Sequence, residues 1–114
     1  DICYRESVPL INPKNFMNEN DRGIIITSRP TIYNIEEITR RQCAKYFPDF
    51  ELVMTGQLPV EEKHDWKRWQ KDIVDRKENI IKERGVYVYF DDSPSIVEGL
   101  RERGIHTIQL GGRI

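Results

Sequence analysis

Four short runs of apolar and β-branched residues recur along the chain. They cover residues 23–28 (GIIITS), 50–55 (FELVMT), 86–90 (VYVYF) and 105–110 (IHTIQL). The first and third are continuously apolar, which is typical of strands that are covered on both faces of a parallel sheet. The second and fourth also contain polar residues, as strands nearer a sheet edge do. The pattern therefore predicts four strands.

Helical patterns precede the first two of these runs. Asn12, followed by Pro13, predicts the start of a helix that ends near Gly23. Asn34 and Glu37 have the spacing of a capping box. Apolar residues then recur at three- and four-residue intervals until a proline ends the pattern, which predicts a second helix.

Two further helices are predicted in the second half of the chain. Residues 76–84 predict a third helix that ends at Gly85. Ser93 or Ser95 begins a fourth, which ends at Gly104.

The alternation of helices with strands predicts the fold class and the domain organisation. Such alternation is typical of an α/β fold with a parallel sheet and right-handed crossovers. With 114 residues we expect one domain over 1–114. Residues 57–75 have no clear place in the alternation and are interpreted as a small, partly helical insertion that holds His64.

Composition narrows the class of protein further. The 18 basic and 19 acidic residues nearly balance, which argues against a protein that depends on nonspecific attraction to a phosphate backbone. No apolar run approaches the length that crosses a bilayer, so no membrane span is expected. Cys3 and Cys43 do not make a disulfide framework, and a reducing cytoplasmic location is the default expectation.

Polar residues that suit phosphate chemistry follow two of the predicted strands. Thr27 ends the first strand, Asp91 and Asp92 follow the third, and Lys77 lies near the start of the third helix. Ligands of open α/β sheets bind beyond the carboxyl ends of the strands. A hydroxyl and an ammonium bind phosphoryl oxygens, and carboxylates bind a hard cation such as Mg²⁺.

These residues stand in segments that resemble the haloacid-dehalogenase-type phosphohydrolases. The segments are GIIITSRP, DRKENIIKERG and VYVYFDDSPSIVEGLRERGIHTIQL, which match the second, third and fourth motifs of that superfamily in order. The resemblance covers most of residues 8–110. It implies a Rossmann-like, three-layer parallel sheet and Mg²⁺-dependent hydrolysis of phosphomonoesters through an aspartyl-phosphate.

The resemblance also implies roles for particular residues. Thr27 would bind the transferring phosphoryl group, and Lys77 would steady its charge. Asp91 and Asp92 would hold Mg²⁺. The acidic pair could instead be a solvated turn after its strand, and the threonine could simply cap the end of its strand.

Neighbouring residues leave alternatives open for each of these roles. Ser28 could bind phosphate in place of the threonine, and Arg29 could contact substrate or form a structural ion pair. Arg76 and Lys71 compete with Lys77 for the role of the site lysine.

The first motif of the superfamily, Asp-x-Asp-x-Thr after a strand, has no complete match. Asp1 could be its second aspartate, with Cys3 in the place of the threonine, or Asp1 could itself stand in that last place. In either register we expect the nucleophile before residue 1. We also expect an upstream strand that lies between 23–28 and 86–90.

Short segments between the motifs leave no room for a cap domain, so the resemblance implies an open site and a large phosphorylated substrate. A nucleotide or a nucleic-acid end is possible, and short stretches resemble the phosphatase domain of phage-type polynucleotide kinases. Aromatic and basic residues of the insertion could form a rim that binds such a substrate: Trp66, Lys67, Arg68, Trp69 and Lys71. A first alternative is a catalytically silent binding module or a fragment of a larger phosphatase. A second alternative, ranked lowest, is a phosphate-accepting receiver-like domain.

Overall fold

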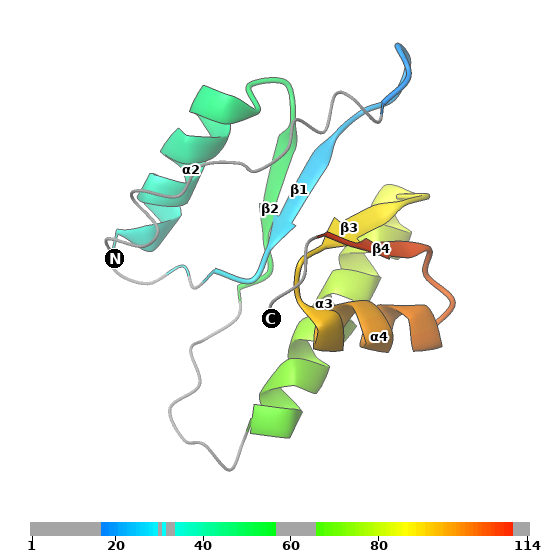
Figure 1. Cartoon of the computed structure of the whole chain (residues 1–114). Coiled ribbons are helices and arrows are strands. Elements are labelled where there is room, and N and C mark those ends of the chain that lie inside the picture. The colour runs from blue at the N-terminus through cyan, green and yellow to red at the C-terminus, as the bar shows by residue number, and fades with distance from the viewer. Residues whose placement is uncertain (1–16, 30, 32–33, 57–65, 111–114) are drawn as a thin grey trace. The chain divides into compact units, whose positions relative to one another are not determined.

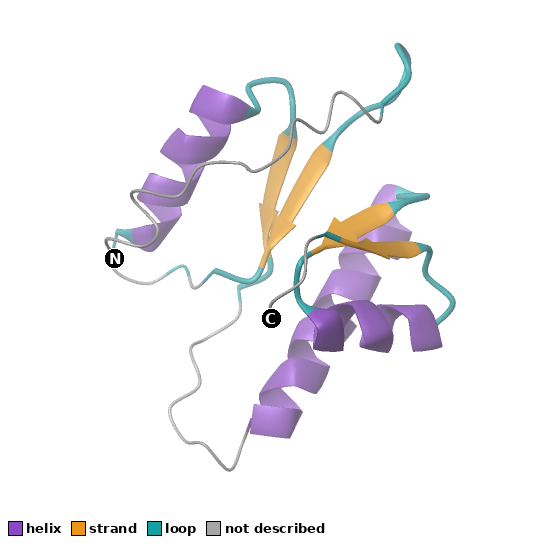
Figure 2. Cartoon of the chain, viewed as in Figure 1, coloured by secondary structure: helices purple, strands orange, loops and turns teal. Residues whose placement is uncertain are grey.

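The computed structural model of the chain describes residues 17–29, 31, 34–56 and 66–110, with the backbone alone for Trp66. Seven elements follow one another in these residues (Figures 1 and 2). They are β1 (Ile24–Thr27), α2 (Ile35–Tyr46), β2 (Glu51–Met54), α3 (Trp66–Arg84), β3 (Tyr89–Asp91), α4 (Pro94–Glu102) and β4 (Thr107–Gln109). Strands and helices alternate throughout, as the sequence predicts.

The chain divides into two compact units, residues 1–58 and 59–114. In the first unit, β1 and β2 form a parallel pair in which Ile24 lies opposite Glu51 and Thr27 opposite Met54. Helix α2 provides the connection between the two strands. A parallel pair needs a crossover of this kind, because a tight turn can join only antiparallel strands.

The second unit repeats the same arrangement of strand, helix and strand. Strands β3 and β4 pair in parallel, with Tyr89 opposite Thr107 and Asp91 opposite Gln109. The connecting helix α4 contacts both strands and also packs against α3 (Figure 1). Most of the buried apolar side chains among the described residues belong to this unit: Ile73, Val74, Ile81, Tyr89, Ile96, Val97 and Leu100.

The prediction of an α/β fold with parallel strands is confirmed. Within the described residues the strands form two separate two-stranded sheets. The expected strand between 23–28 and 86–90 stays a prediction. None of the described helices has the length and apolar character that crossing a bilayer requires.

Helix α3 is longer than predicted, because it begins at Trp66 and not at residue 76. No glycine or proline interrupts residues 66–84, and Ile73, Val74 and Ile81 lie on one buried face of the helix. The high density of charged residues in the first half obscures this apolar face in the sequence. Part of the segment interpreted as an insertion is therefore regular helix, and residues 57–65 lie outside the described residues.

The predicted helix that ends near Gly23 is wrong over residues 17–23, which contain turn and irregular backbone. Its start at Asn12 lies outside the described residues. Asn18 donates a backbone hydrogen bond of 2.7 Å to the Asp21 carboxylate, and the Asp21 backbone N–H returns one of 3.0 Å to the Asn18 carbonyl. Such local side-chain bonds compete with a helical backbone.

The start of α2 and the ends of α3 and α4 lie where the sequence predicts them, but the predicted capping interaction of α2 is absent. Asn34 precedes α2, yet its side chain caps no backbone N–H, so the predicted capping box does not form. Glu37 instead pairs with Arg41 one turn further along α2. Gly85 and Gly104 follow α3 and α4 with φ of 67° and 79°, a backbone conformation that favours glycine at helix ends.

Candidate functional site

A buried ion pair joins α3 to β3 in the second unit. The Lys77 Nζ atom lies 2.8 Å from Asp91 Oδ2, and the exposed fraction of each side chain is 7%. The two residues are 14 positions apart in the chain. Of the three basic residues that compete for the site role, the structure places Lys77 beside the acidic pair.

Local structure explains why these two side chains meet. Lys77 lies on the buried face of α3, between Val74 and Ile81. Asp91 is the last residue of β3 and not, as the sequence suggested, the first residue after it. Its backbone carbonyl accepts a hydrogen bond of 2.9 Å from the Leu110 N–H, which fixes the end of the strand against β4.

Both oxygens of the Asp91 carboxylate are engaged. Oδ2 accepts hydrogen bonds from Lys77 Nζ and, at 3.0 Å, from the hydroxyl of Tyr89. Oδ1 accepts a bond of 2.9 Å from the backbone N–H of Ser93. We call Lys77, Tyr89, Asp91 and the Ser93 N–H the Asp91 cluster.

The ionisation of the cluster follows from its contacts. Burial by itself raises the pKa of Asp91, but the Lys77 charge and the hydrogen bonds from Lys77, Ser93 and Tyr89 together hold that pKa below its ordinary value. Burial, followed by the nearby charge of Asp91, raises the pKa of Tyr89 above its ordinary value. Asp91 is therefore a carboxylate and Tyr89 a protonated phenol.

Lys77 retains capacity for a further anionic group. An ammonium has three N–H donors. Among the described residues, its one hydrogen-bond partner is Asp91, and its cation also lies 5.5 Å from the centre of the Tyr89 ring. The remaining donors could bind an oxygen of a phosphoryl group.

Asp92 differs from its neighbour in being exposed. Within the described residues its carboxylate takes part in no hydrogen bond or ion pair. No group of three or more His, Cys, Asp or Glu side chains suited to a metal ion occurs among the residues that the structure describes. However, Mg²⁺ usually takes only one or two protein carboxylates and completes its shell with waters and substrate phosphates. Asp92, together with the remaining lone pair of Asp91 Oδ1, could supply these one or two carboxylate ligands.

Thr27 lies in the first unit, at the end of β1, where its side chain is half-buried. Its hydroxyl oxygen accepts a hydrogen bond of 3.2 Å from the backbone N–H of Arg29. The threonine therefore caps the end of its strand, while its hydroxyl proton remains able to donate to a ligand. The neighbouring Ser28 is also half-buried.

Arg29 extends from the end of β1 to α2. Its guanidinium donates hydrogen bonds to the hydroxyl of Thr39, at 3.1 Å, and to the side-chain carbonyl of Gln42. The Thr39 hydroxyl in turn donates to the carbonyl of Ile35. These contacts connect Arg29 to α2 and give it a structural role, one of the two roles that the sequence left open.

The basic residues proposed as a rim lie at the start of α3. Lys67, Arg68 and Lys71 are exposed and Trp69 is half-buried, while the side chain of Trp66 lies outside the described residues. Lys71 is 3.7 Å from Asp75 in a largely exposed pair. Arg76 pairs at 3.0 Å with Asp72 on the same helix. Neither of these competitors of Lys77 contacts the acidic pair.

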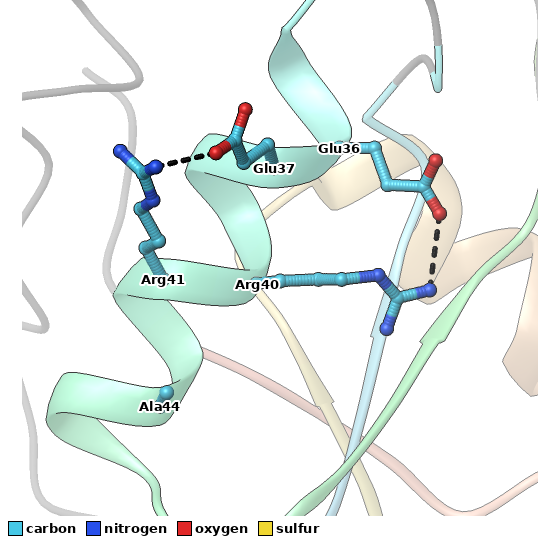
Figure 3. Close-up of a pocket in the computed structure, with 5 residues that line it drawn as sticks. All are labelled: Glu36, Glu37, Arg40, Arg41 and Ala44. Atoms are coloured by element: carbon cyan, nitrogen blue, oxygen red, sulfur yellow. Dashed lines mark hydrogen bonds and ion pairs between the residues drawn. The ribbon is translucent and has the colours of Figure 1, made fainter.

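A shallow hollow lies on α2, lined by Glu36, Glu37, Arg40, Arg41 and Ala44 (Figure 3). Its charges form two ion pairs along the helix, Glu36 with Arg40 and Glu37 with Arg41. All four side chains are largely exposed, and each charge is neutralised one turn away. No charged group of the hollow is therefore left to bind a ligand, and the Asp91 cluster is the stronger candidate site.

The sequence interpretation missed Tyr89 as a member of the site. The signal was present, because residues two apart on a strand share a face, and Tyr89 precedes Asp91 by two positions. The proposed roles of Asp1 fall outside the described residues. Comparison of the chain with protein-family models, with curated proteins and with solved structures gives no match.

Proposed function

We propose that the protein is a Mg²⁺-dependent phosphomonoester hydrolase of the haloacid-dehalogenase type. In this reaction an aspartate carboxylate attacks phosphorus, and the bond from phosphorus to the alcohol oxygen breaks. Water then cleaves the aspartyl-phosphate and releases inorganic phosphate. The nucleophilic aspartate is expected outside the described residues.

The observation that supports this proposal is the burial of Lys77 against Asp91 at the carboxyl end of a parallel strand. Burying an ammonium and a carboxylate together is costly, so a pair of this kind adds little net stability compared with apolar side chains. A buried carboxylate with a shifted pKa and a specific charged partner at a strand end is a characteristic of functional sites. Free donors on Lys77 could neutralise the charge of a phosphoryl group during transfer.

Asp92 and Asp91 are the residues that would hold the metal ion. A bound Mg²⁺ would supply positive charge that polarises the phosphoryl oxygens. Because Asp91 is already engaged by Lys77 and Tyr89, we assign the larger share of metal binding to Asp92. Asp91 would chiefly hold the lysine in place.

The resemblance also implies that Thr27, with Ser28 as its neighbour, binds phosphate by donating its hydroxyl proton, and this role stays a prediction. This role requires the three-layer arrangement that the resemblance implies, in which one parallel sheet includes both strand pairs. An open site without a cap would accept a large phosphorylated substrate, such as a nucleotide or a nucleic-acid end.

The test is hydrolysis of p-nitrophenyl phosphate by the full-length natural protein, with and without Mg²⁺. Asp92→Asn should abolish the Mg²⁺-dependent rate while leaving the unfolding temperature nearly unchanged, because Asp92 is exposed. Glu98→Gln is the matched control, since it removes an exposed carboxylate from α4. Wild-type rates in the Asp92→Asn protein would contradict the metal assignment.

A second candidate function is a binding module without catalytic turnover. It is favoured by the engagement of both Asp91 oxygens in hydrogen bonds with groups of the protein itself. Isothermal titration with Mg²⁺ and with inorganic phosphate distinguishes the two functions. Binding that depends on Asp92 and Lys77, without hydrolysis by the full-length protein, would support the module.

A further inference from the structure

Tyr89 contacts both members of the buried ion pair. Its hydroxyl donates to Asp91 Oδ2, the same oxygen that accepts from Lys77. The face of its ring lies under the Lys77 ammonium, 5.5 Å from Nζ to the ring centre. Its exposed fraction is 7%, so these contacts are shielded from water.

The position of Tyr89 on β3 accounts for this double contact. Tyr89 and Asp91 are two residues apart on one strand, so their side chains lie on the same face. Strand pairing fixes both backbones, because the Tyr89 N–H bonds to the His106 carbonyl at 3.0 Å. The ring and hydroxyl thus form a rigid support beside the carboxylate.

The Asp91 carboxylate would be held less firmly without this support. Ser93 N–H holds Oδ1, and Lys77 alone would remain on Oδ2. A lysine side chain is flexible and can follow a carboxylate that turns. Removal of the hydroxyl would therefore let the ion pair take more than one orientation.

We infer that Tyr89 is a positioning residue, which fixes the orientation of the Asp91 carboxylate and the direction of the Lys77 ammonium. The positioning itself does not depend on the proposed function. Only its consequence, the placement of Lys77 against a phosphoryl group, rests on that function. Tyr89 itself would not touch the substrate.

The experiment compares the full-length wild-type protein with Tyr89→Phe, which keeps the ring and removes the hydroxyl. Tyr87→Phe is the matched control, because Tyr87 precedes the same strand and is 65% exposed. The NMR signals to follow are the Asp91 side-chain carboxyl carbon and the Lys77 ammonium protons. Both should shift or broaden in Tyr89→Phe and stay unchanged in Tyr87→Phe.

A measurement on the wild-type protein makes the test independent of how the variant folds. The Tyr89 hydroxyl proton should exchange slowly enough to be observed, because it is buried and bonded to a carboxylate. Its signal should move in Asp91→Asn. A hydroxyl proton that exchanges rapidly with water would overturn the inference.

Kinetics separates this inference from the proposed function. If the wild-type protein is active, Tyr89→Phe should lower kcat by about ten- to a hundredfold, the effect of losing one hydrogen bond to a charged group, with little change in KM. A kcat within about twofold of wild type, or unchanged NMR signals, would overturn the positioning role. If the wild-type protein is inactive, the proposed function fails, and the NMR signals alone decide the inference.

Discussion

The ion pairs of α2 and the ion pair between α3 and β3 use the same chemical groups in opposite environments. Glu36 and Arg40 are 44% and 58% exposed, whereas Lys77 and Asp91 are each 7% exposed. Exposed pairs contribute about 0–1 kcal/mol, because water and salt screen them. In a buried pair, loss of one partner leaves an uncompensated charge, which costs several times more.

This difference separates the exposed charges of a helix surface from a charge pair that needs a specific explanation. The α2 pairs stabilise their own helix turn and could be replaced by neutral residues at small cost. The Lys77–Asp91 pair interrupts an apolar face of α3, where an apolar side chain would pack as well. Its presence there supports the proposal of a phosphate site at this strand end.

The largest expected effect is that of removing the buried lysine charge. Lys77→Met keeps the length of the side chain and should lower the free energy of unfolding by about 3–5 kcal/mol, because Asp91 then remains buried without a cation. Urea unfolding measures the change. Lys71→Met, on the exposed face of the same helix, is the control and should cost less than about 1 kcal/mol. Equal losses of unfolding free energy in the two variants would contradict a larger contribution from the buried Lys77.

Acid should weaken the buried pair selectively. The pKa of Asp91 in the folded protein lies below its ordinary value, although burial alone would raise it, because Lys77 and three hydrogen bonds favour the carboxylate. Its contribution to stability is therefore complete above the ordinary aspartate pKa of about 3.9 and is lost as pH falls through the lower folded value.

Unfolding free energies of wild type and Asp91→Asn, measured from neutral pH into the acid range, test this expectation. The difference between the two proteins should be largest at neutral pH and should shrink on acidification. A difference that stays constant with pH would contradict an ionised Asp91 in the folded protein.

An intermediate effect is expected where α4 ends beside α3. The Arg103 guanidinium pairs with Asp75 and, at 3.3 Å, with Glu78, and the arginine side chain is 26% exposed. Arg103→Ala should lower the free energy of unfolding by about 1 kcal/mol, at the upper end for partly exposed pairs. Arg84→Ala, whose partner Glu83 is 71% exposed, is the control and should cost less. The loss in Arg103→Ala should diminish in high salt, and a salt-independent loss would point to packing of the arginine stem instead.

The fold could be predicted from the sequence wherever local signals and apolar patterns agree. β1 and β2 lie within the predicted runs, and Gly85 and Gly104 end their helices as expected. β3 was placed too early, because Val86 and Tyr87 have strand propensity but lie in the connection after α3. Propensity identifies a strand more reliably than the residues at its ends.

The candidate site could be predicted only in part. Lys77 and Asp91 could be named from their places relative to the predicted elements, but their contact joins residues 14 positions apart and depends on tertiary structure. Nothing local distinguishes Lys77 from Arg76 or Lys71, which lie on other faces of α3. Tyr89 shares a strand face with Asp91 because β3 includes both residues, whereas the sequence predicts a strand that ends at Phe90.

The smallest effect is expected for the α2 pair of Glu37 and Arg41, which are 63% and 76% exposed. A double-mutant cycle of Glu37→Gln and Arg41→Gln should give a coupling of about 0.3–0.5 kcal/mol, as for other i, i+4 pairs on helices. The coupling should vanish in high salt, because exposed charges are screened within about one Debye length. A coupling above about 1 kcal/mol that persists in salt would mean that α2 shields this pair from water, and the contrast with Lys77–Asp91 would lose its basis.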